Sequence, residues 1–524
     1  SVFMLVWLTV KLIKEKQVNI YLNIVSLAVF SLALFYSLST FWAIDRGMAF
    51  FGFLKFLPVA LYLIVLMQQG NVDSVITKLP YIAAIMTLVS SLGMQVPFLE
   101  SFFAVSGRLA GFFQYPNTFA LFLLVAELIV ISKEKFTVTD GIVTLVLIFG
   151  LLYTGSRTVF VLLAIFNLAM LFLKKNRCAK LVLLIGIVVA VIAVALYAFR
   201  SGNIGTFGRF LTISVKESTF VGRLLYFQDA LPVVLRHPFG LGYMGYYYIQ
   251  QSIQTGIYAV RFAHNDFLQI LLDVGWIPFL LFLMAIIKTI CSKKTAVYKK
   301  IILVVISLHG CFDFDLQFIA VFFVLLLFTE YDTGKKYVIK NRISVDIVSG
   351  ITALICIYCG IALTLSSFGQ SGAANEMYPW NTQNEIALLV NEKDSAKANE
   401  IADDIISRNP YVTVAYSAKA RYYFSKGDFG QVIKYKNLIF EKAPFAYEEY
   451  EEYCYMLMHG ITLYEQAGDA YSVEICKREL FSAKEKIEGM ENRLSKLGKG
   501  IKDQPVTQLP EEIDAYIAAI RETE

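Results

Sequence analysis

The sequence predicts an all-α fold in which a polytopic membrane domain precedes a soluble helical domain. Hydrophobic residues make up 57% of the 524 residues and charged residues only 17%, with a mean hydropathy of +0.59. Soluble domains carry about 25% charged residues. The apolar excess lies in runs close to the roughly 17–25 residues that cross a bilayer. We therefore predict a membrane domain over residues 1–367, a linker over 368–384 and a soluble helical domain over 385–524.

About twelve apolar stretches make up the predicted membrane domain. The sixth, tenth and eleventh are short for a span, so the count of twelve depends on them. The stretches cover about residues 2–13, 21–41, 49–67, 79–96, 117–131, 141–153, 159–173, 181–199, 267–287, 301–311, 318–328 and 345–366.

The placement of Lys and Arg predicts which turns face the cytoplasm. Every second turn is rich in these residues, as cytoplasmic turns are, and the turns between carry single arginines. This alternation places a long polar loop at about residues 200–266, and the domain at 385–524, on the extracytoplasmic side. The net charge of +5 says little beyond this placement, and we predict no nucleic-acid partner.

The region from residue 385 onward shows features of stacked helical hairpins. Pro410 and Pro444 lie 34 positions apart in similar tetrapeptides, and Gly427-Asp428 recurs as Gly468-Asp469. A proline that opens a helix pair and a glycine at its turn suit such a stack. The pattern resembles tetratricopeptide repeats. An ordinary helical bundle is the alternative, and either fold offers a surface for a protein partner.

The polar interval from about residue 200 to 275 separates two blocks of apolar stretches. Few acidic residues balance its basic side chains, so a basic loop lies against the membrane. Guanidinium groups bind phosphate oxygens through two parallel hydrogen bonds and stay charged at any working pH. The interval therefore predicts an anionic ligand, most simply a phosphate or diphosphate. Its basic residues are Arg200, Arg209, Arg223, Arg236, His237, Arg261 and His264.

Two arginines have the clearest case for ligand contact. Arg157 follows Gly155 and Ser156 at the outer mouth of an apolar hairpin, where a charge normally faces a cavity or a partner. Arg223 follows a glycine and leads an amphipathic run; its alternative role is a helix cap or a salt bridge with Asp229. Arginines at span ends also serve as interfacial anchors, which is the alternative for Arg200.

His264 lies where the long loop meets the ninth apolar stretch. Asn265 and Asp266 follow it, and an apolar helix is expected to begin at once. A neutral imidazole there can act as a general base on an acceptor hydroxyl, and a protonated one can hold a phosphate. The helix N-terminus favours an anion and disfavours an imidazolium, which favours the base. The alternative is a packed histidine.

Two further segments contain chemically suggestive residues. Gly240 and Gly242 lie in a glycine-rich turn that follows no strand, so a dinucleotide site is not indicated, although the backbone there can approach a sugar or phosphate. The segment His309–Asp315 is acidic and outward. Together with His264 it suggests a metal site, but no ligand cluster can be shown from the sequence. We predict no metal and no cofactor.

Taken in order, these motifs resemble the O-antigen ligase and polymerase (Wzy_C) family. The resemblance runs from about residue 36 to 320. Its segments are Trp42–Asp45, Arg108–Phe113 with Pro116-Asn117, Gly155–Arg157, Gly222-Arg223, His237–Gly242 and His264–Leu268 with Gly275.

The resemblance implies a multi-span glycosyltransferase of the GT-C type that needs no metal. Such an enzyme takes glycan from undecaprenyl diphosphate at the outer face of the bacterial cytoplasmic membrane. By this resemblance Arg157 and Arg223 would hold the diphosphate, and His264 would activate or position the acceptor hydroxyl. We expect further substrate contacts from Arg108, Arg209, Arg261, Asn265, Asp266, Gly240 and Gly242.

Three alternatives remain open from the sequence. The acceptor is a glycan or a protein, so a protein O-oligosaccharyltransferase of the same family is possible. A carrier or flippase for lipid-linked glycan would place charges along a path within its spans, whereas the spans here are nearly uncharged. A membrane-anchored repeat scaffold would leave the arginine-rich loop unexplained.

Overall fold

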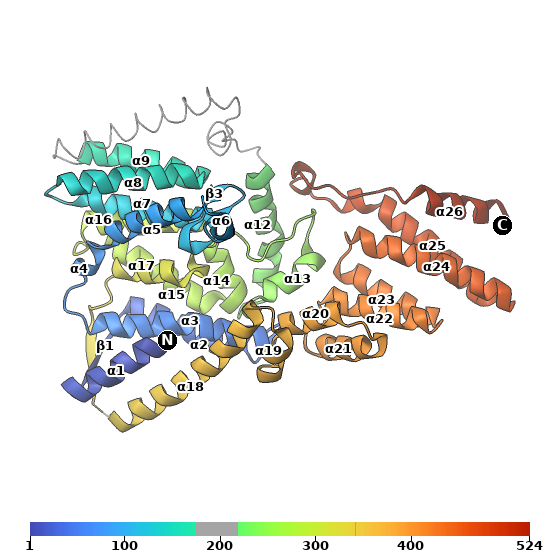
Figure 1. The fold of residues 1–524 in the computed structure, drawn as a ribbon, viewed down its shortest axis with the longest axis horizontal. Helices are drawn as coiled ribbons and strands as arrows, with labels where there is room; N and C mark the ends of the chain where they lie inside the picture. The colour runs from blue at the N-terminus through green and yellow to red at the C-terminus, as the bar shows by residue number, and fades with distance from the viewer. Residues whose placement is uncertain (174–217, 341, 524) are drawn as a thin grey trace.

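A computed structural model describes residues 1–173, 218–340 and 342–523, and this part of the chain is mostly helical (Figure 1). Its strands form two small antiparallel sheets. β1 (Val18–Leu22) pairs with β4 (Lys335–Ile339), and β2 (Ala104–Val105) pairs with β3 (Arg108–Leu109). The described residues thus have the predicted helical class with two minor sheets added.

The predicted apolar stretches within the described residues contain helices. Three segments are long and apolar enough to cross a membrane, namely Arg46–Met67, Asp73–Gly93 and Val345–Ser367, and others are apolar but shorter. The eighth stretch lies outside the described residues, and the count of twelve spans stays a prediction. The helices of this region are α1 (Val2–Glu15), α2 (Ile24–Ser39), α3 (Arg46–Met67), α4 (Asp73–Ile76), α5 (Leu79–Gly93), α6 (Pro97–Phe103), η1 (Gly111–Phe113), α7 (Pro116–Ser132), α8 (Val138–Thr154), α9 (Arg157–Leu173), α14 (Asp266–Val274), α15 (Trp276–Cys291), α16 (Val297–Gly310), η2 (Asp315–Gln317), α17 (Ile319–Leu327) and α18 (Arg342–Ser367).

The ninth predicted span is not one helix. It is divided into α14 and α15 at Gly275, whose φ is +81°. A Cβ at this position would lie 2.1 Å from the carbonyl oxygen of Pro238, so only glycine fits against the loop that crosses here. The apolar stretch predicted as a span over 267–287 is therefore interrupted, because apolar character alone does not show a glycine that breaks the helix. Whether it crosses the membrane stays a prediction.

α7 is the central helix of the membrane domain. Nearly every residue from Pro116 to Ile131 is buried, and the helix contacts α5, α8, α9 and α16. Apart from Glu127, the helix is apolar on nearly all sides, so it has no solvent-facing stripe and suits such a position. α7 therefore holds fixed the residues at its N-terminal end, Tyr115 and Asn117.

The described part of the long polar loop is itself helical. It contains α12 (Ser218–Arg236) and α13 (Gly245–Ile253), and residues 200–217 lie outside the described residues. α12 runs across the ends of the membrane-domain helices, between them and the C-terminal helices (Figure 1). Arg223 is carried near the start of this helix.

The C-terminal region forms successive antiparallel helices on one side of the membrane domain (Figure 1). Gly427 and Gly468, with φ of +73° and +72°, occupy equivalent turns, and the following Asp428 and Asp469 cap the next helix. The segment predicted as a linker contains α19 and the start of α20. The helices are α19 (Ser371–Met377), α20 (Thr382–Asn391), α21 (Ser395–Arg408), α22 (Thr413–Ser425), α23 (Phe429–Lys442), α24 (Tyr447–Ala467), α25 (Ala470–Glu488), η3 (Met490–Arg493), η4 (Gly498–Gly500) and α26 (Glu511–Thr523).

Asp45 joins the C-terminal region to the membrane domain. Its carboxylate is buried and caps α3 by accepting a hydrogen bond from the Met48 backbone at 2.9 Å. The other oxygen accepts from the hydroxyl of Thr382 at 2.5 Å and from Nδ2 of Asn409 at 3.0 Å. The Tyr378 hydroxyl donates to the carbonyl of Gly47 at 3.1 Å. The start of α3 and the C-terminal helices are thus held together by buried polar contacts.

A second contact is made by the segment 495–502 near the end of the chain. Its Leu497 and Ile501 pack in a small apolar cluster with Val221 and Leu225 of α12. Gly498 approaches the backbone of Thr255 so closely that a Cβ would lie 2.2 Å from its carbonyl oxygen. The 495–502 segment therefore packs directly against the helix that carries Arg223.

Candidate functional site

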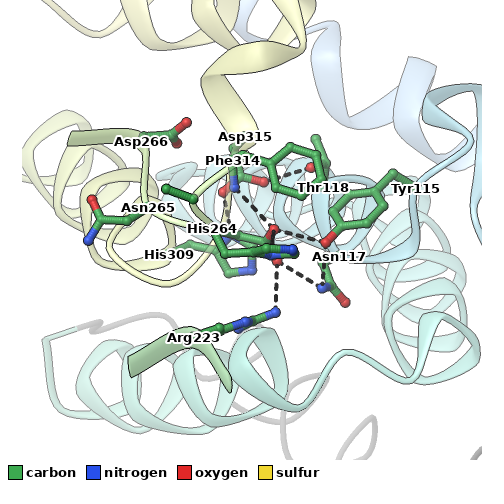
Figure 2. Close-up of polar contacts among 12 residues, drawn as sticks. Tyr115, Asn117, Thr118, Arg223, His264, Asn265, Asp266, His309, Phe314 and Asp315 are labelled. Carbon is green, nitrogen blue, oxygen red and sulfur yellow. Dashed lines mark hydrogen bonds and ion pairs between the residues drawn. The ribbon is translucent and has the colours of Figure 1, made fainter. Parts of the chain in front are cut away.

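A polar cluster forms around Asp313, in the turn between α16 and η2. Figure 2 shows Tyr115, Asn117, Arg223 and His264 converging. Asp313 is 1% exposed. Its Oδ1 accepts a hydrogen bond from the Tyr115 hydroxyl at 2.9 Å, and its Oδ2 accepts from Nδ2 of Asn117 at 2.8 Å. Nη2 of Arg223 lies 3.3 Å from Oδ2, and Nδ1 of His264 lies 3.4 Å from Oδ1. One carboxylate thus joins four side chains from three distant parts of the sequence.

The charges around Asp313 keep it ionised. Burial by itself would raise the pKa of this carboxyl, but the interaction with His264 and the positive charge of Arg223 outweigh burial and hold the pKa below its usual range. Burial also raises the pKa of the Tyr115 hydroxyl, and the Asp313 charge adds to that effect, so the phenol stays a neutral donor. The cluster therefore combines a carboxylate with one guanidinium and one imidazole.

His264 has an unusual backbone conformation. Its φ is +51°, in the left-handed region that few non-glycine residues adopt, although histidine is among those enriched there. The ring lies edge-on to Phe314 with centroids 4.8 Å apart, and it is 5.9 Å from the ring of Tyr226. Because Nδ1 faces Asp313, Nε2 points away from that carboxylate. Strained positions of this kind cluster at functional sites.

Asn265 and Asp266 hold the backbone that follows His264 in place. Oδ1 of Asn265 accepts from the Leu268 backbone at 2.9 Å and so caps α14, as predicted for a helix starting directly after the histidine. Its Nδ2 donates to the carbonyl of Cys311 at 2.9 Å, and Asp266 accepts from the Leu316 backbone at 2.9 Å. Both side chains therefore bind the turn that carries Asp313. Their contact with substrate stays a prediction.

A second carboxylate, that of Asp315, anchors the same turn to neighbouring helices. Asp315 is fully buried; it lies 2.5 Å from Nδ1 of His309 and accepts from the Thr118 hydroxyl at 2.7 Å. Thr118 belongs to α7 and His309 to α16, so the turn is held between two packed helices. In the described residues no group of three or more histidine, cysteine, aspartate or glutamate side chains is arranged to hold a metal ion.

Arg108 connects the Asp313 cluster to the turn that carries Arg157. Its Nε donates to the carbonyl of Thr154 at 2.7 Å, and its Nη2 donates to Oδ1 of Asn117 at 2.7 Å. α8 ends at Gly155 with φ of +60°, and Arg157 is the first residue of α9. The structure thus brings the Arg157 turn to the same cluster through Arg108 and Asn117.

Arg223 contacts Asp313 rather than its predicted alternative partner, Asp229. The latter accepts from the backbone and hydroxyl of Thr255 and from the hydroxyl of Tyr258 at 2.7–3.0 Å. Asp229 therefore organises the loop after α13. Arg223 is therefore not paired with Asp229, and it contacts the cluster that also contains His264.

The two predicted glycines pack against protein atoms. A Cβ at Gly240 would lie 2.5 Å from the carbonyl of Asp273, and one at Gly242 would lie 2.4 Å from Cβ of Ala43. Their φ values are +77° and +80°, so both turns require glycine. The structure thus shows a packing role at these positions, and substrate contact there stays a prediction.

In the described residues Arg261 makes no hydrogen bond or ion pair with Asp313. Arg261 is exposed, and its guanidinium carbon lies 5.8 Å from the centroid of the Phe262 ring. Arg209 and Arg200 fall outside the described residues.

Three members of the cluster were not among the predicted site residues: Tyr115, Asn117 and Asp313. Tyr115 and Asn117 flank Pro116 in an outer segment of the predicted topology. Asp313 lies within the acidic outward segment considered for a metal. Asn117 and Asp313 are 196 positions apart, so nothing in their spacing shows that they meet.

A family model described as O-Antigen ligase (Wzy_C) matches residues 142–283, which is 142 of the 524 residues. The matched segment includes Arg157, Arg223 and His264, whereas Asp313 lies outside it. No curated protein and no solved structure matches the chain. Together with the apolar helices, the matched domain indicates an integral membrane protein with a glycan-transferring function.

Proposed function

We propose that this protein transfers or polymerises glycan from an undecaprenyl-diphosphate-linked donor at the outer face of the bacterial cytoplasmic membrane. The observation that carries this proposal is the contact of both His264 and Arg223 with the buried carboxylate of Asp313. An imidazole and a guanidinium held by one carboxylate suit transfer from a diphosphate to a hydroxyl, as a base and as a stabiliser of the leaving charge. The match to an O-antigen ligase domain over the segment that contains both residues supports the same chemistry.

His264 acts on the acceptor. With Nδ1 at 3.4 Å from Asp313, the carboxylate favours the tautomer that carries the proton on Nδ1, which leaves Nε2 to accept one. Nε2 removes the proton of the acceptor hydroxyl as its oxygen forms a bond to the anomeric carbon of the donor sugar. The bond from that carbon to the diphosphate oxygen breaks, and its electron pair leaves with the diphosphate.

Arg223 and Arg157 act on the leaving group. A diphosphate gains negative charge as it departs, and fixed guanidinium groups stabilise that charge. Arg223 has five N–H donors, of which one is engaged with Asp313 in the structure, so others are available to a phosphate oxygen. Arg157 opens α9 at the turn linked to the cluster through Arg108.

The C-terminal helices contact two elements near the proposed site. They contact α12 through the 495–502 segment and the start of α3 through Asp45. On the predicted topology they lie outside, where the acceptor is a growing glycan or a protein. We propose that this tetratricopeptide-like region presents the acceptor or a protein partner to the site.

The proposal is tested with His264→Ala and Arg223→Ala in cells that make the glycan. Each variant is expected to abolish product and to accumulate lipid-linked donor while the protein level stays normal. His459→Ala and Arg236→Ala are matched controls, because both side chains are exposed and Arg236 lies on the same helix as Arg223. Normal product from both His264→Ala and Arg223→Ala would contradict the assigned site.

A further inference from the structure

Lys55 lies within α3, one of the segments long and apolar enough to cross a membrane. It is nine residues past the start of the helix, about 13 Å along the axis at about 1.5 Å per residue. An ionisable side chain at membrane depth is costly and is usually functional. The sequence prediction of nearly uncharged spans gave this lysine no role.

The groups in contact with Lys55 Nζ are neutral hydrogen-bond acceptors and aromatic rings. Nζ donates to the Tyr243 hydroxyl at 3.1 Å and to Oε1 of Gln317 at 2.8 Å. It lies 5.4, 4.8 and 5.3 Å from the ring centroids of Phe56, Tyr243 and Phe262. Aromatic faces attract a cation but carry no net charge. Two of the three N–H donors of the ammonium are engaged by these neutral oxygens.

No carboxylate in the described residues forms an ion pair with Lys55 within 4.0 Å. Asp273 acts on it from further away, but the two oxygens of Asp273 accept hydrogen bonds from the Tyr36 hydroxyl at 2.9 Å and from Nε2 of Gln269 at 2.8 Å. Both carboxylate oxygens of Asp273 therefore accept hydrogen bonds from neutral side chains on α2 and α14. In the described residues Lys55 therefore has no carboxylate in direct contact.

Arg261 adds a second positive charge beside the same aromatic ring. Its guanidinium carbon is 5.8 Å from the centroid of Phe262, and it acts on Lys55 as a like charge. In the described residues Arg261 also forms no ion pair with a carboxylate within 4.0 Å. The contrast with Arg223 is direct, because Arg223 contacts Asp313. Lys55 and Arg261 are thus two basic side chains beside one aromatic ring, and in the described residues neither has an ion pair.

This pair of cations adjoins the candidate site. The ring of Phe262 is 5.1 Å from that of Phe314, which is in turn 4.8 Å from the His264 ring. Gln317, which accepts from Lys55, ends the short helix that follows Asp313. Lys55 therefore approaches the Asp313 turn from within the membrane domain.

We propose that Lys55 and Arg261 form a binding site for a phosphate-type oxyanion. Lys55 offers its third N–H donor and Arg261 its planar fork of donors, while Phe262 lies beside both cations. If the proposed function holds, the oxyanion is a phosphate of the diphosphate donor, and the site places the polyprenyl chain on the membrane side of His264. The same chemistry would fit the headgroup of an anionic phospholipid, and the experiment separates these two sources.

The test measures binding of glycan-free polyprenyl diphosphate to the purified full chain in phosphatidylcholine nanodiscs. Lys55→Met and Arg261→Gln are each expected to weaken binding at least about tenfold, whereas Lys55→Arg retains most of the affinity. Lys288→Met is the matched control, because Lys288 is an exposed lysine in the last turn of α15. Wild-type affinity in Lys55→Met, with an unchanged unfolding midpoint, would overturn the site.

Two further measurements identify the source and separate this proposal from the proposed function. Phosphatidylglycerol added to the nanodiscs should compete weakly; competition as strong as that of polyprenyl diphosphate assigns the oxyanion site to phospholipid headgroups. His264→Ala should bind polyprenyl diphosphate like the wild type. Absence of glycan transfer by the wild type would refute the proposed function and leave this binding result standing, whereas unchanged binding in Lys55→Met would refute the site alone.

Discussion

Replacing Asp313 by Asn tests the role of the buried carboxylate. The change keeps the shape of the side chain but removes its charge and puts an NH2 group in place of one oxygen. If the amide nitrogen takes the Oδ2 position, it faces the donors of Asn117 and Arg223; if it takes the Oδ1 position, it faces Tyr115 and His264. In the first orientation two hydrogen-bond donors lose their acceptor. In the second, the Tyr115 hydroxyl can turn to accept from the amide, and the electrostatic contact with His264 is lost.

The expected cost follows from these contacts. A hydrogen bond to a charged group contributes about 1.5–3 kcal/mol, so the first orientation would cost about 3–6 kcal/mol and the second less. The side chains of Arg223 and His264 are 17% and 20% exposed, so water compensates part of the loss. We expect the free energy of unfolding to fall by about 2–4 kcal/mol.

Asp313→Asn is expected to slow glycan transfer because it changes the tautomer of the His264 imidazole. Loss of the carboxylate in a serine hydrolase triad lowers kcat by about 10⁴-fold because the tautomer is wrong. The longer 3.4 Å contact here predicts a smaller effect, a kcat lower by about 10²–10³-fold, or about 2.7–4 kcal/mol in the barrier.

The assay compares glycan transfer by purified wild type, Asp313→Asn, His264→Ala and the double variant. Because Asp313 acts through His264, the double variant should be little slower than His264→Ala alone. Asp332→Asn, an exposed carboxylate, is the control and should transfer normally. A kcat within about threefold of wild type for Asp313→Asn, or fully additive losses in the double variant, would refute this reasoning.

The remaining predictions concern docking and topology. Gly498→Val places a side chain against the Thr255 carbonyl, so faster hydrogen exchange is expected over α12; Gly430→Val, which has no backbone contact, should leave it unchanged. Asp45→Ala removes the α3 cap and two buried acceptor contacts, an expected loss of about 2–4 kcal/mol, so limited proteolysis should release the C-terminal helices sooner; unchanged release would contradict this. Reporter fusions at residues 137, 176 and 370 should report cytoplasmic, cytoplasmic and external positions, and a cytoplasmic tail would overturn the predicted sidedness.

The sequence allowed prediction of helices where apolar runs and capping residues agree. The stretch at 117–131 became α7, and the helix expected directly after His264 starts at Asp266 with Asn265 as its cap. The break at Gly275 was not predicted, because it depends on the loop at Pro238 that packs against it. Local pattern therefore predicted elements, and long-range packing decided where they are interrupted.

The candidate site was predictable only in part, for a related reason. His264, Arg223 and Arg157 stand in recognisable local motifs near span ends. The carboxylate that His264 and Arg223 contact comes from a turn 49 positions beyond His264, and charge and helical period say nothing about such a contact. Lys55 was missed because one lysine hardly changes the apolar character of a 22-residue helix, whereas its ring contacts exist only in the folded protein.

The central claim is tested most directly by reconstituting the purified protein with a defined polyprenyl-diphosphate-linked glycan and an acceptor glycan. The measurement follows transferred glycan and released polyprenyl diphosphate together. We predict that the wild type releases one polyprenyl diphosphate for each glycan transferred and that His264→Ala releases none above background. Movement of the intact lipid-linked donor across the bilayer, without transfer or release, would contradict the account and identify a carrier instead.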